Sequence, residues 1–152
     1  MAIATPVVIV ASMKAAGRVT RLFTLPAADR RLLFRAYWTL ASASLRVALL
    51  PFPRAIAFGA TPLGSGQLPP GDVRWAVAAA ARRLPLRTKC IEQGVAVQRL
   101  LRQSGHPAVL HYGVRDGGQA GPLQAHVWVT LDDRPVVGGE EASGFRQVAT
   151  FP

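Results

Sequence analysis

The spacing of the apolar residues changes at Gly105, and this change limits the folds that the chain can adopt. Before that glycine, apolar residues recur every three or four positions, which is the period of a helix with one buried face. After it, apolar and polar residues alternate over residues 123–131, which is the period of a half-buried strand. Helices followed by strands predict an α+β fold, in which a helix packs on a small antiparallel sheet.

Three helices are predicted before the change of period. The first covers residues 27–50 and has arginines along one side and a wide apolar face along the other. That apolar face suits either core packing or the docking of a partner. The second helix has Asp72 as its N-cap, and the third has Thr88 as its N-cap and ends where Gly105 takes the left-handed conformation.

Residues 51–71 contain five prolines and four glycines and therefore predict a linker or lid. We accordingly expect an N-terminal helical docking region with its linker over 1–71 and a core over 72–152, which together form one compact unit. Residues 1–14 hold an apolar run that no basic residue precedes, so they are a poor signal peptide. They predict a short strand or an adhering segment instead.

The alternating part of the chain predicts three strands and a tight turn. In the second strand, His126 and Trp128 fall on one face and Val127 and Val129 on the other. The last residues, from Glu140 onward, predict a loop with room for a short final strand. The strands are expected at 108–115, 123–131 and 134–139, with the turn at Asp132 and Asp133.

Most of the net charge of +10 lies in the N-terminal half. Residues 1–89 carry 13 Lys or Arg against two Asp, whereas residues 90–152 carry five basic and six acidic residues. This asymmetry fits solvated helix faces rich in arginine, or an acidic partner. The basic residues are not interleaved with aromatic residues in a nucleic-acid recognition pattern, so we do not expect nucleic acid as a partner.

The only cysteine of the chain, Cys90, lies at the start of the third predicted helix. Unpaired backbone N–H groups and the helix dipole favour an anion there, and Arg87 and Lys89 add positive charge. These effects favour the thiolate, and the same N–H groups can receive an oxyanion. The alternative is a small buried hydrophobic residue. A single cysteine excludes an intramolecular disulfide and fits a reducing cytoplasm.

A catalytic thiolate needs a histidine as its base, and His126 on the central strand is the best placed of the three histidines. The alternative is a structural strand histidine. Trp128 suits either core packing or a wall of the thiolate site. Gly94, one turn after Cys90, would allow the helix to approach the strand of His126 closely.

Two segments carry a resemblance to a known family. They are "CIEQGVAVQRLLRQSGHPAVLHYGV" and "AHVWVTLDDRPVVGG". They resemble the transglutaminase-like cysteine peptidase of lasso-peptide biosynthesis, the leader peptidase that is related to the C-terminal part of microcin-processing proteins. The resemblance covers residues 85–152, and the helix 27–50 with "LLPFPRAIAFG" is similar to the N-terminal region of that family.

The resemblance implies that Cys90 is the nucleophile and His126 the general base of leader removal. It further implies a precursor leader peptide as substrate, a separate leader-recognition protein, and an ATP-dependent macrolactam cyclase that uses the freed core amine. A cytoplasmic enzyme without cofactor or metal follows, and membrane contact is not expected. The alternative is a non-catalytic scaffold of the same fold that binds a partner.

The third catalytic group is where the sequence departs from the pattern of that family. The family's acid lies on the strand after the His strand, and Gly138 or Gly139 occupies its place here. Glu140 is the nearest acidic residue and is our candidate for orienting His126. The alternatives are a main-chain carbonyl or the side chain of Gln124.

Overall fold

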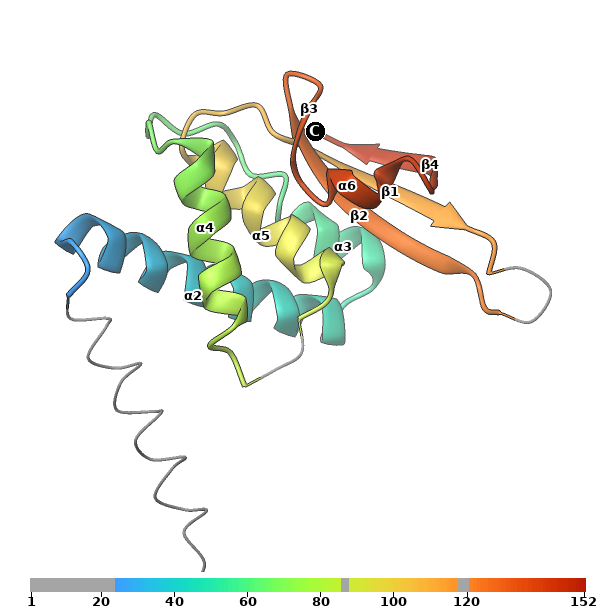
Figure 1. Cartoon of the computed structure of the whole chain (residues 1–152), viewed down its shortest axis with the longest axis horizontal. Helices are drawn as coiled ribbons and strands as arrows, with labels where there is room; N and C mark the ends of the chain where they lie inside the picture. Colours follow the sequence, from blue (N-terminus) through green and yellow to red (C-terminus); the bar gives the residue numbers. More distant parts are fainter. Residues whose placement is uncertain (1–23, 86–87, 118–120) are drawn as a thin grey trace, which may run out of the picture.

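A computed structural model of the chain describes residues 24–85, 88–117 and 121–152. Figure 1 shows the long helices gathered on one side and the strands on the other, which confirms the predicted α+β fold. The segment 1–14, predicted as a strand or an adhering segment, lies outside the described residues. The elements are α2 (Ala27–Leu49), α3 (Phe52–Ala57), α4 (Pro70–Ala81), α5 (Cys90–Gln103), β1 (Val109–Arg115), β2 (Gln124–Leu131), β3 (Arg134–Val137), α6 (Gly139–Ala142) and β4 (Arg146–Phe151).

The four strands form one antiparallel sheet in the order β3-β2-β1-β4. The turn between β2 and β3 lies at Asp132 and Asp133, as predicted, and both residues have positive φ, 49° and 60°. Two consecutive residues in this conformation match the right-handed twist of a hairpin. Strand β4 pairs with β1 at the opposite edge, so the last residues of the chain form a full strand.

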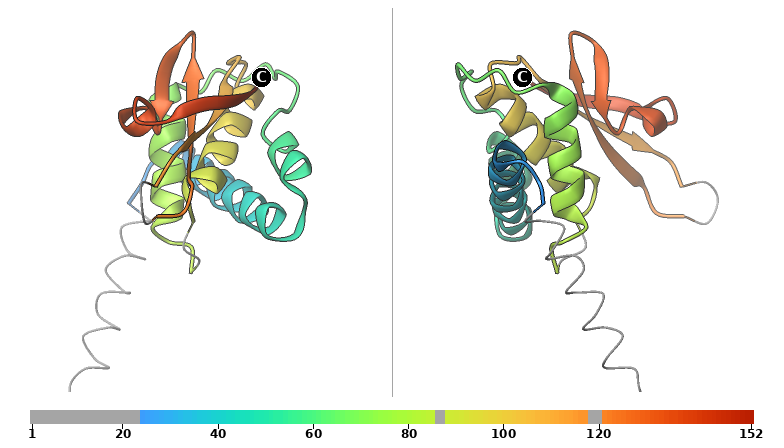
Figure 2. Two further views of the ribbon diagram at one scale, coloured as in Figure 1. Left: turned by 90° about the vertical axis from the view of Figure 1, so that its right-hand side faces the viewer. Right: turned by 60° about the vertical axis from the view of Figure 1, so that its left-hand side comes forward.

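Helix α5 forms the centre of the hydrophobic core. It packs on α2, α4 and β2, and the two views of Figure 2 show the three long helices on one side of the sheet. Its buried apolar side chains belong to a single cluster that continues from the helices into the sheet. Because apolar burial drives folding, this cluster fixes α5 against β2. The largest members of the cluster include Leu40, Val73, Val77, Val95, Leu100, Leu101, Leu110 and Val129.

The wide apolar face of α2 is only partly buried. Leu33 and Leu40 pack in the core, whereas the side chains of Phe34 and Trp38 are 64% and 56% exposed. Core packing therefore accounts for one side of the helix, and an apolar strip remains on its surface. Within the described ranges, no helix has the length and apolar character that crossing a membrane would require.

Residues 51–71, predicted as a linker or lid, contain the short helix α3 and a segment bonded to α5. The N–H of Gly64 donates to the carbonyl of Arg102 over 2.8 Å, and the side chain of Arg102 donates to the carbonyl of Thr61 over 2.6 Å. Arg102 lies near the C-terminal end of α5, at the opposite end of the helix from Cys90. The segment therefore fastens the far end of α5 and does not cover Cys90.

A second set of contacts joins α3 to the middle of α5. The guanidinium of Arg99 lies 4.0 Å from the ring centroid of Phe58 and donates to its carbonyl over 2.7 Å. Burial, and then the nearby Arg46, lower the pKa of Arg99 below its ordinary value. Arg46 covers the same ring at 4.5 Å, so α2, α3 and α5 meet at Phe58.

Two helix starts differ from the predicted ones. Helix α4 begins at Pro70, and Asp72 lies in its first turn instead of at the cap. Proline suits this position because it has no N–H to leave unpaired. The N-cap of α5 is Lys89 instead of Thr88, because the Glu92 carboxylate reaches back to accept the Lys89 N–H over 2.8 Å.

Candidate functional site

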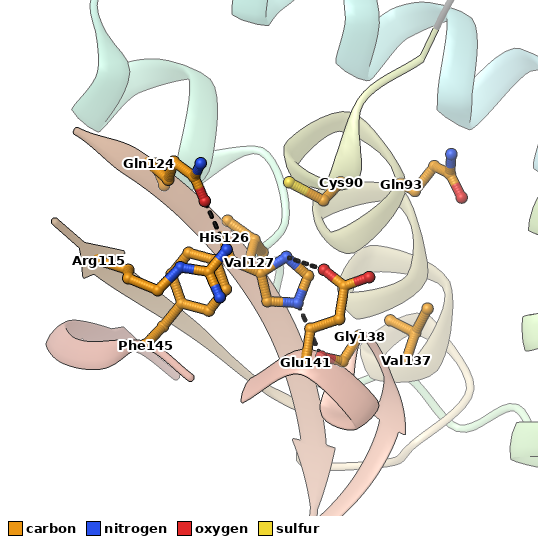
Figure 3. Close-up of a pocket in the computed structure, with 11 residues that line it drawn as sticks. Cys90, Gln93, Arg115, Gln124, His126, Val127, Val137, Gly138, Glu141 and Phe145 are labelled. Atoms are coloured by element: carbon orange, nitrogen blue, oxygen red, sulfur yellow. Dashed lines mark hydrogen bonds and ion pairs between the residues drawn. The ribbon is translucent and has the colours of Figure 1, made fainter. Parts of the chain in front are cut away.

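Cys90 and His126 line the same pocket, which has a volume of about 580 Å³. Figure 3 shows it between the start of α5, strand β2 and the short helix α6. The structure therefore brings together the two residues that the sequence singled out for nucleophilic chemistry. The other lining residues are Gln93, Arg115, Gln124, Ala125, Val127, Val137, Gly138, Glu141 and Phe145.

Helix α5 presents the thiol to solvent. Cys90 is its first residue and is exposed, so the reading of Cys90 as a buried hydrophobic residue is wrong. The first N–H groups of a helix have no partner within the helix, which gives an anion at this position a stabilising environment. Arg87, one of the two basic residues expected beside the thiol, lies outside the described residues.

A glycine allows α5 to lie directly against the strand of His126. A Cβ atom placed on Gly94 would lie only 2.6 Å from Cγ1 of Val127, closer than such atoms approach in proteins. The expectation that Gly94 permits a close approach is therefore confirmed. Because Val127 follows His126 directly, this contact sets the distance between the helix start and the imidazole.

The imidazole of His126 is held in one tautomer. Its Nε2 lies 2.8 Å from the carbonyl oxygen of Gly138. A carbonyl oxygen only accepts hydrogen bonds, so Nε2 carries the proton, and Nδ1 is the free acceptor of the neutral ring. In Figure 3, Nδ1 is the ring nitrogen on the side of Cys90. The nitrogen able to take a proton from the thiol therefore faces the helix start.

Gly138 supplies the carbonyl through its backbone conformation. Its φ of +73° lies in the left-handed region, and a Cβ there would lie 2.6 Å from the Val127 carbonyl oxygen and 3.2 Å from His126 Nε2. Only glycine avoids both the strain and the clash. Of the alternatives for orienting His126, the main-chain carbonyl is the one that holds the ring. Gln124 instead accepts a hydrogen bond from Arg115.

The two neighbouring glutamates of α6 point to different partners. Glu140 lies 4.0 Å from Arg74, and its side chain is 95% exposed. Glu141 lies 3.8 Å from Nδ1 of His126. The structure therefore brings Glu141 to His126, where the sequence suggested Glu140. The reason is that residues 139–142 form a helical turn instead of extending β3, and neighbouring residues on a helix point about 100° apart.

Trp128 supports His126 from the sheet and does not line the pocket. Trp128 is 8% exposed, and its ring stacks on the His126 ring at a centroid distance of 6.2 Å. His111 stacks on the same indole at 5.4 Å and bonds Thr130 through Nε2 over 2.8 Å. His111 therefore has a structural role.

These residues form the parts needed for acyl transfer. A thiol at a helix start can attack a carbonyl carbon, the adjacent N–H groups can receive the oxyanion, and the oriented imidazole can move the proton. Among the described residues no hydrogen bond joins Cys90 to His126. Sγ and Nδ1 must therefore come closer together for proton transfer, as in sites whose catalytic hydrogen bonds tighten when substrate binds.

The chain matches a known family of proteins. The family model described as the Transglutaminase-like superfamily matches residues 30–150. The matched range begins in α2 and ends in β4, so it includes the helices as well as the sheet. No curated protein and no solved structure matches the chain.

Proposed function

We propose, from the fact that the chain belongs to the transglutaminase-like superfamily, that it is a cysteine peptidase that removes the leader from a ribosomally made lasso-peptide precursor. The superfamily commonly includes cysteine peptidases, which supports the reaction class. The choice of precursor rests on the sequence resemblance around Cys90 and His126. The observation that carries the proposal is the pocket that both side chains line, with Nδ1 of His126 free to act as a base.

The first half of the reaction forms a thioester. Sγ of Cys90 attacks the carbonyl carbon of the leader–core bond, and the thiol proton passes to Nδ1 of His126. The N–H groups at the start of α5 receive the developing oxyanion. The proton on Nδ1 then moves to the core nitrogen as the C–N bond breaks. The leader remains on Cys90 as a thioester, and the core peptide leaves with a free amine.

Water completes the cycle. Nδ1 of His126 takes a proton from the water as its oxygen attacks the thioester, and the C–S bond breaks to release the leader with a terminal carboxylate. Throughout, Nε2 keeps its hydrogen bond to Gly138, so the ring does not turn. Glu141 provides the negative charge that stabilises the imidazolium, because the carbonyl of Gly138 carries no net charge.

The proposal includes partners in a cytoplasmic pathway. The freed core amine is the substrate of an ATP-dependent macrolactam cyclase, which joins it to an acidic side chain. A separate leader-recognition protein docks on α2 through an acidic, partly apolar segment. The groove there has a volume of about 360 Å³ and is lined by the apolar and aromatic side chains of α2 together with two arginines: Leu33, Phe34, Tyr37, Trp38, Arg30 and Arg83. This combination of aromatic anchors and positive charge fits such a segment.

A non-catalytic scaffold that binds a partner is the second candidate function. The absence of a Cys90–His126 hydrogen bond among the described residues, and the carbonyl in place of an acid, favour it. In that case the pocket would be a remnant, and α2 would be the functional surface.

Alkylation of the thiol separates the two candidates. Iodoacetamide at neutral pH is expected to label Cys90 faster than it labels free glutathione and to abolish precursor cleavage, because a thiolate reacts faster than a thiol. Cys90 is the only cysteine of the chain, so mass spectrometry of the intact protein assigns the label without ambiguity. Labelling no faster than glutathione, with cleavage unaffected by full labelling, would reject the peptidase.

Glu141→Gln is expected to slow cleavage about 3- to 10-fold at low salt, because the variant lacks the charge facing Nδ1. The difference should shrink in 0.5 M NaCl, since the Glu141 side chain is 75% exposed and its field is screened. Glu140→Gln is the matched control, with the same charge change on the same helical turn, and should stay within about twofold of the unmodified protein. Equal losses in both variants would contradict a specific role for Glu141.

A further inference from the structure

Arg115 lies at the end of β1 and lines the pocket together with Cys90 and His126. Its guanidinium is fixed by two contacts. The carbon CZ lies 4.5 Å from the ring centroid of Phe145, and one NH2 group donates to Oε1 of Gln124. An arginine side chain held on both sides loses little further rotamer entropy when it binds a ligand.

Within the described ranges of the chain, no salt bridge neutralises the charge of Arg115. Among residues 24–85, 88–117 and 121–152, the two glutamates of α6 face other groups, since Glu140 lies 4.0 Å from Arg74 and Glu141 lies 3.8 Å from Nδ1 of His126. No carboxylate pairs with Arg115 in that part of the chain. In Figure 3, Arg115 and Glu141 lie on different sides of the His126 ring. The pocket thus has a positive side and a negative side.

The positive side offers only hydrogen-bond donors to a ligand. A guanidinium cannot accept a hydrogen bond, so the atom of Gln124 that faces it is the carbonyl oxygen, and the amide N–H groups of Gln124 point away from Arg115. The N–H groups of Arg115 that do not bond Gln124 form a planar fork. Such a fork matches the two oxygens of a carboxylate and repels a cationic side chain.

We propose that Arg115 is a specificity-determining residue that binds a carboxylate of the substrate next to the bond that Cys90 attacks. The proposal rests on the proposed peptidase function. The carboxylate comes either from an acidic side chain near the scissile bond or from the C-terminus of a short peptide. A substrate with a neutral amide at that place binds more weakly, and one with a basic residue there is rejected.

The test measures binding in the absence of cleavage. Full-length Cys90→Ala is titrated with fluorescein-labelled octapeptides of Ala and Gly in which a single Asp is placed at each position in turn, with the C-terminus amidated. A matched set carries Asn instead of Asp, and a third set carries Asn with a free C-terminal carboxylate. Fluorescence anisotropy at low salt gives the Kd of each peptide, so a failure of the cleavage reaction does not affect the result.

At one position, Asp is expected to bind about tenfold more tightly than Asn, because hydrogen bonds to charged groups are the stronger ones. Preference for the free C-terminus instead would assign the carboxylate to the peptide end. Either preference should disappear in Cys90→Ala/Arg115→Gln and be partly kept in Cys90→Ala/Arg115→Lys, which retains the charge but not the fork. Thermal unfolding confirms that both variants fold.

Two outcomes would overturn the proposal. One is equal affinity for all three peptide sets at every position. The other is a carboxylate preference that persists unchanged in folded Cys90→Ala/Arg115→Gln. Loss of cleavage in the unmodified protein with an intact Asp preference would instead reject the peptidase and leave the carboxylate site standing.

Discussion

Replacing Cys90 with Ala is expected to reduce precursor cleavage by about 10³-fold or more, since no other group in the pocket can form the thioester. The fold should not change, because the Cys90 side chain is exposed and its removal creates no cavity. Substitutions of this kind alter the free energy of unfolding by less than about 0.5 kcal/mol. Mass spectrometry of the precursor products measures the first effect, and urea unfolding measures the second.

Cys90→Ser provides the matched control for shape. The serine hydroxyl has nearly the size of the thiol but remains protonated at neutral pH, so this variant should be almost as inactive as Cys90→Ala. Both variants should still bind the precursor and the recognition protein. Cleavage by Cys90→Ala at the rate of the unmodified protein would show that the thiol is incidental and would favour the scaffold.

Much of the fold follows from local patterns in the sequence. The apolar period of residues 27–50 is sufficient to locate α2, because a helix of that length repeats its pattern many times. The turn at Asp132 and Asp133 is equally predictable, since short polar residues tolerate positive φ. The sequence predicts a helix start at Cys90, which the structure has, but it predicts the N-cap one residue too early.

The parts that local patterns missed depend on contacts distant in sequence. The four residues of α6 are too few to show a period, so the sequence predicts that β3 continues through Gly138. That prediction points to Glu140, whereas the structure brings Glu141 to His126. The Gly138-Gly139 pair was the available signal that the strand ends. The contact of Arg115 with Phe145 depends on the pairing of β1 with β4, which no local pattern encodes.

The exposed apolar strip on α2 is another feature that local sequence patterns cannot predict. The period of the sequence indicates a wide apolar face but does not show how much of it α4 and α5 cover. Phe34 and Trp38 stay exposed because the helices that bury Leu33 and Leu40 lie on another side of α2. The share of this apolar face that becomes buried depends on the angles at which the helices cross. Those angles are set by the side-chain ridges along the whole contact between two helices.

Gly94→Ala is expected to destabilise the protein by about 1–3 kcal/mol, as overpacking of a core does. The added Cβ would lie 2.6 Å from Cγ1 of Val127, so α5 must move away from β2. This loss should outweigh the roughly 1 kcal/mol by which alanine exceeds glycine as a helix former. Since the same movement separates Cys90 from His126, cleavage should fall about 10- to 100-fold. Urea unfolding and cleavage rates measure the two effects.

Gly71→Ala is the matched control for Gly94→Ala, because it makes the same substitution in another helix. Gly71 lies in the first turn of α4, and a Cβ there would meet no atom within 4 Å. Without a clash, alanine should stabilise the protein by about 0.4–1 kcal/mol through the entropy of the unfolded chain, with cleavage unchanged. If both variants were stabilised and fully active, α5 would not depend on its close contact with β2, and Gly94 would not set the distance between thiol and imidazole.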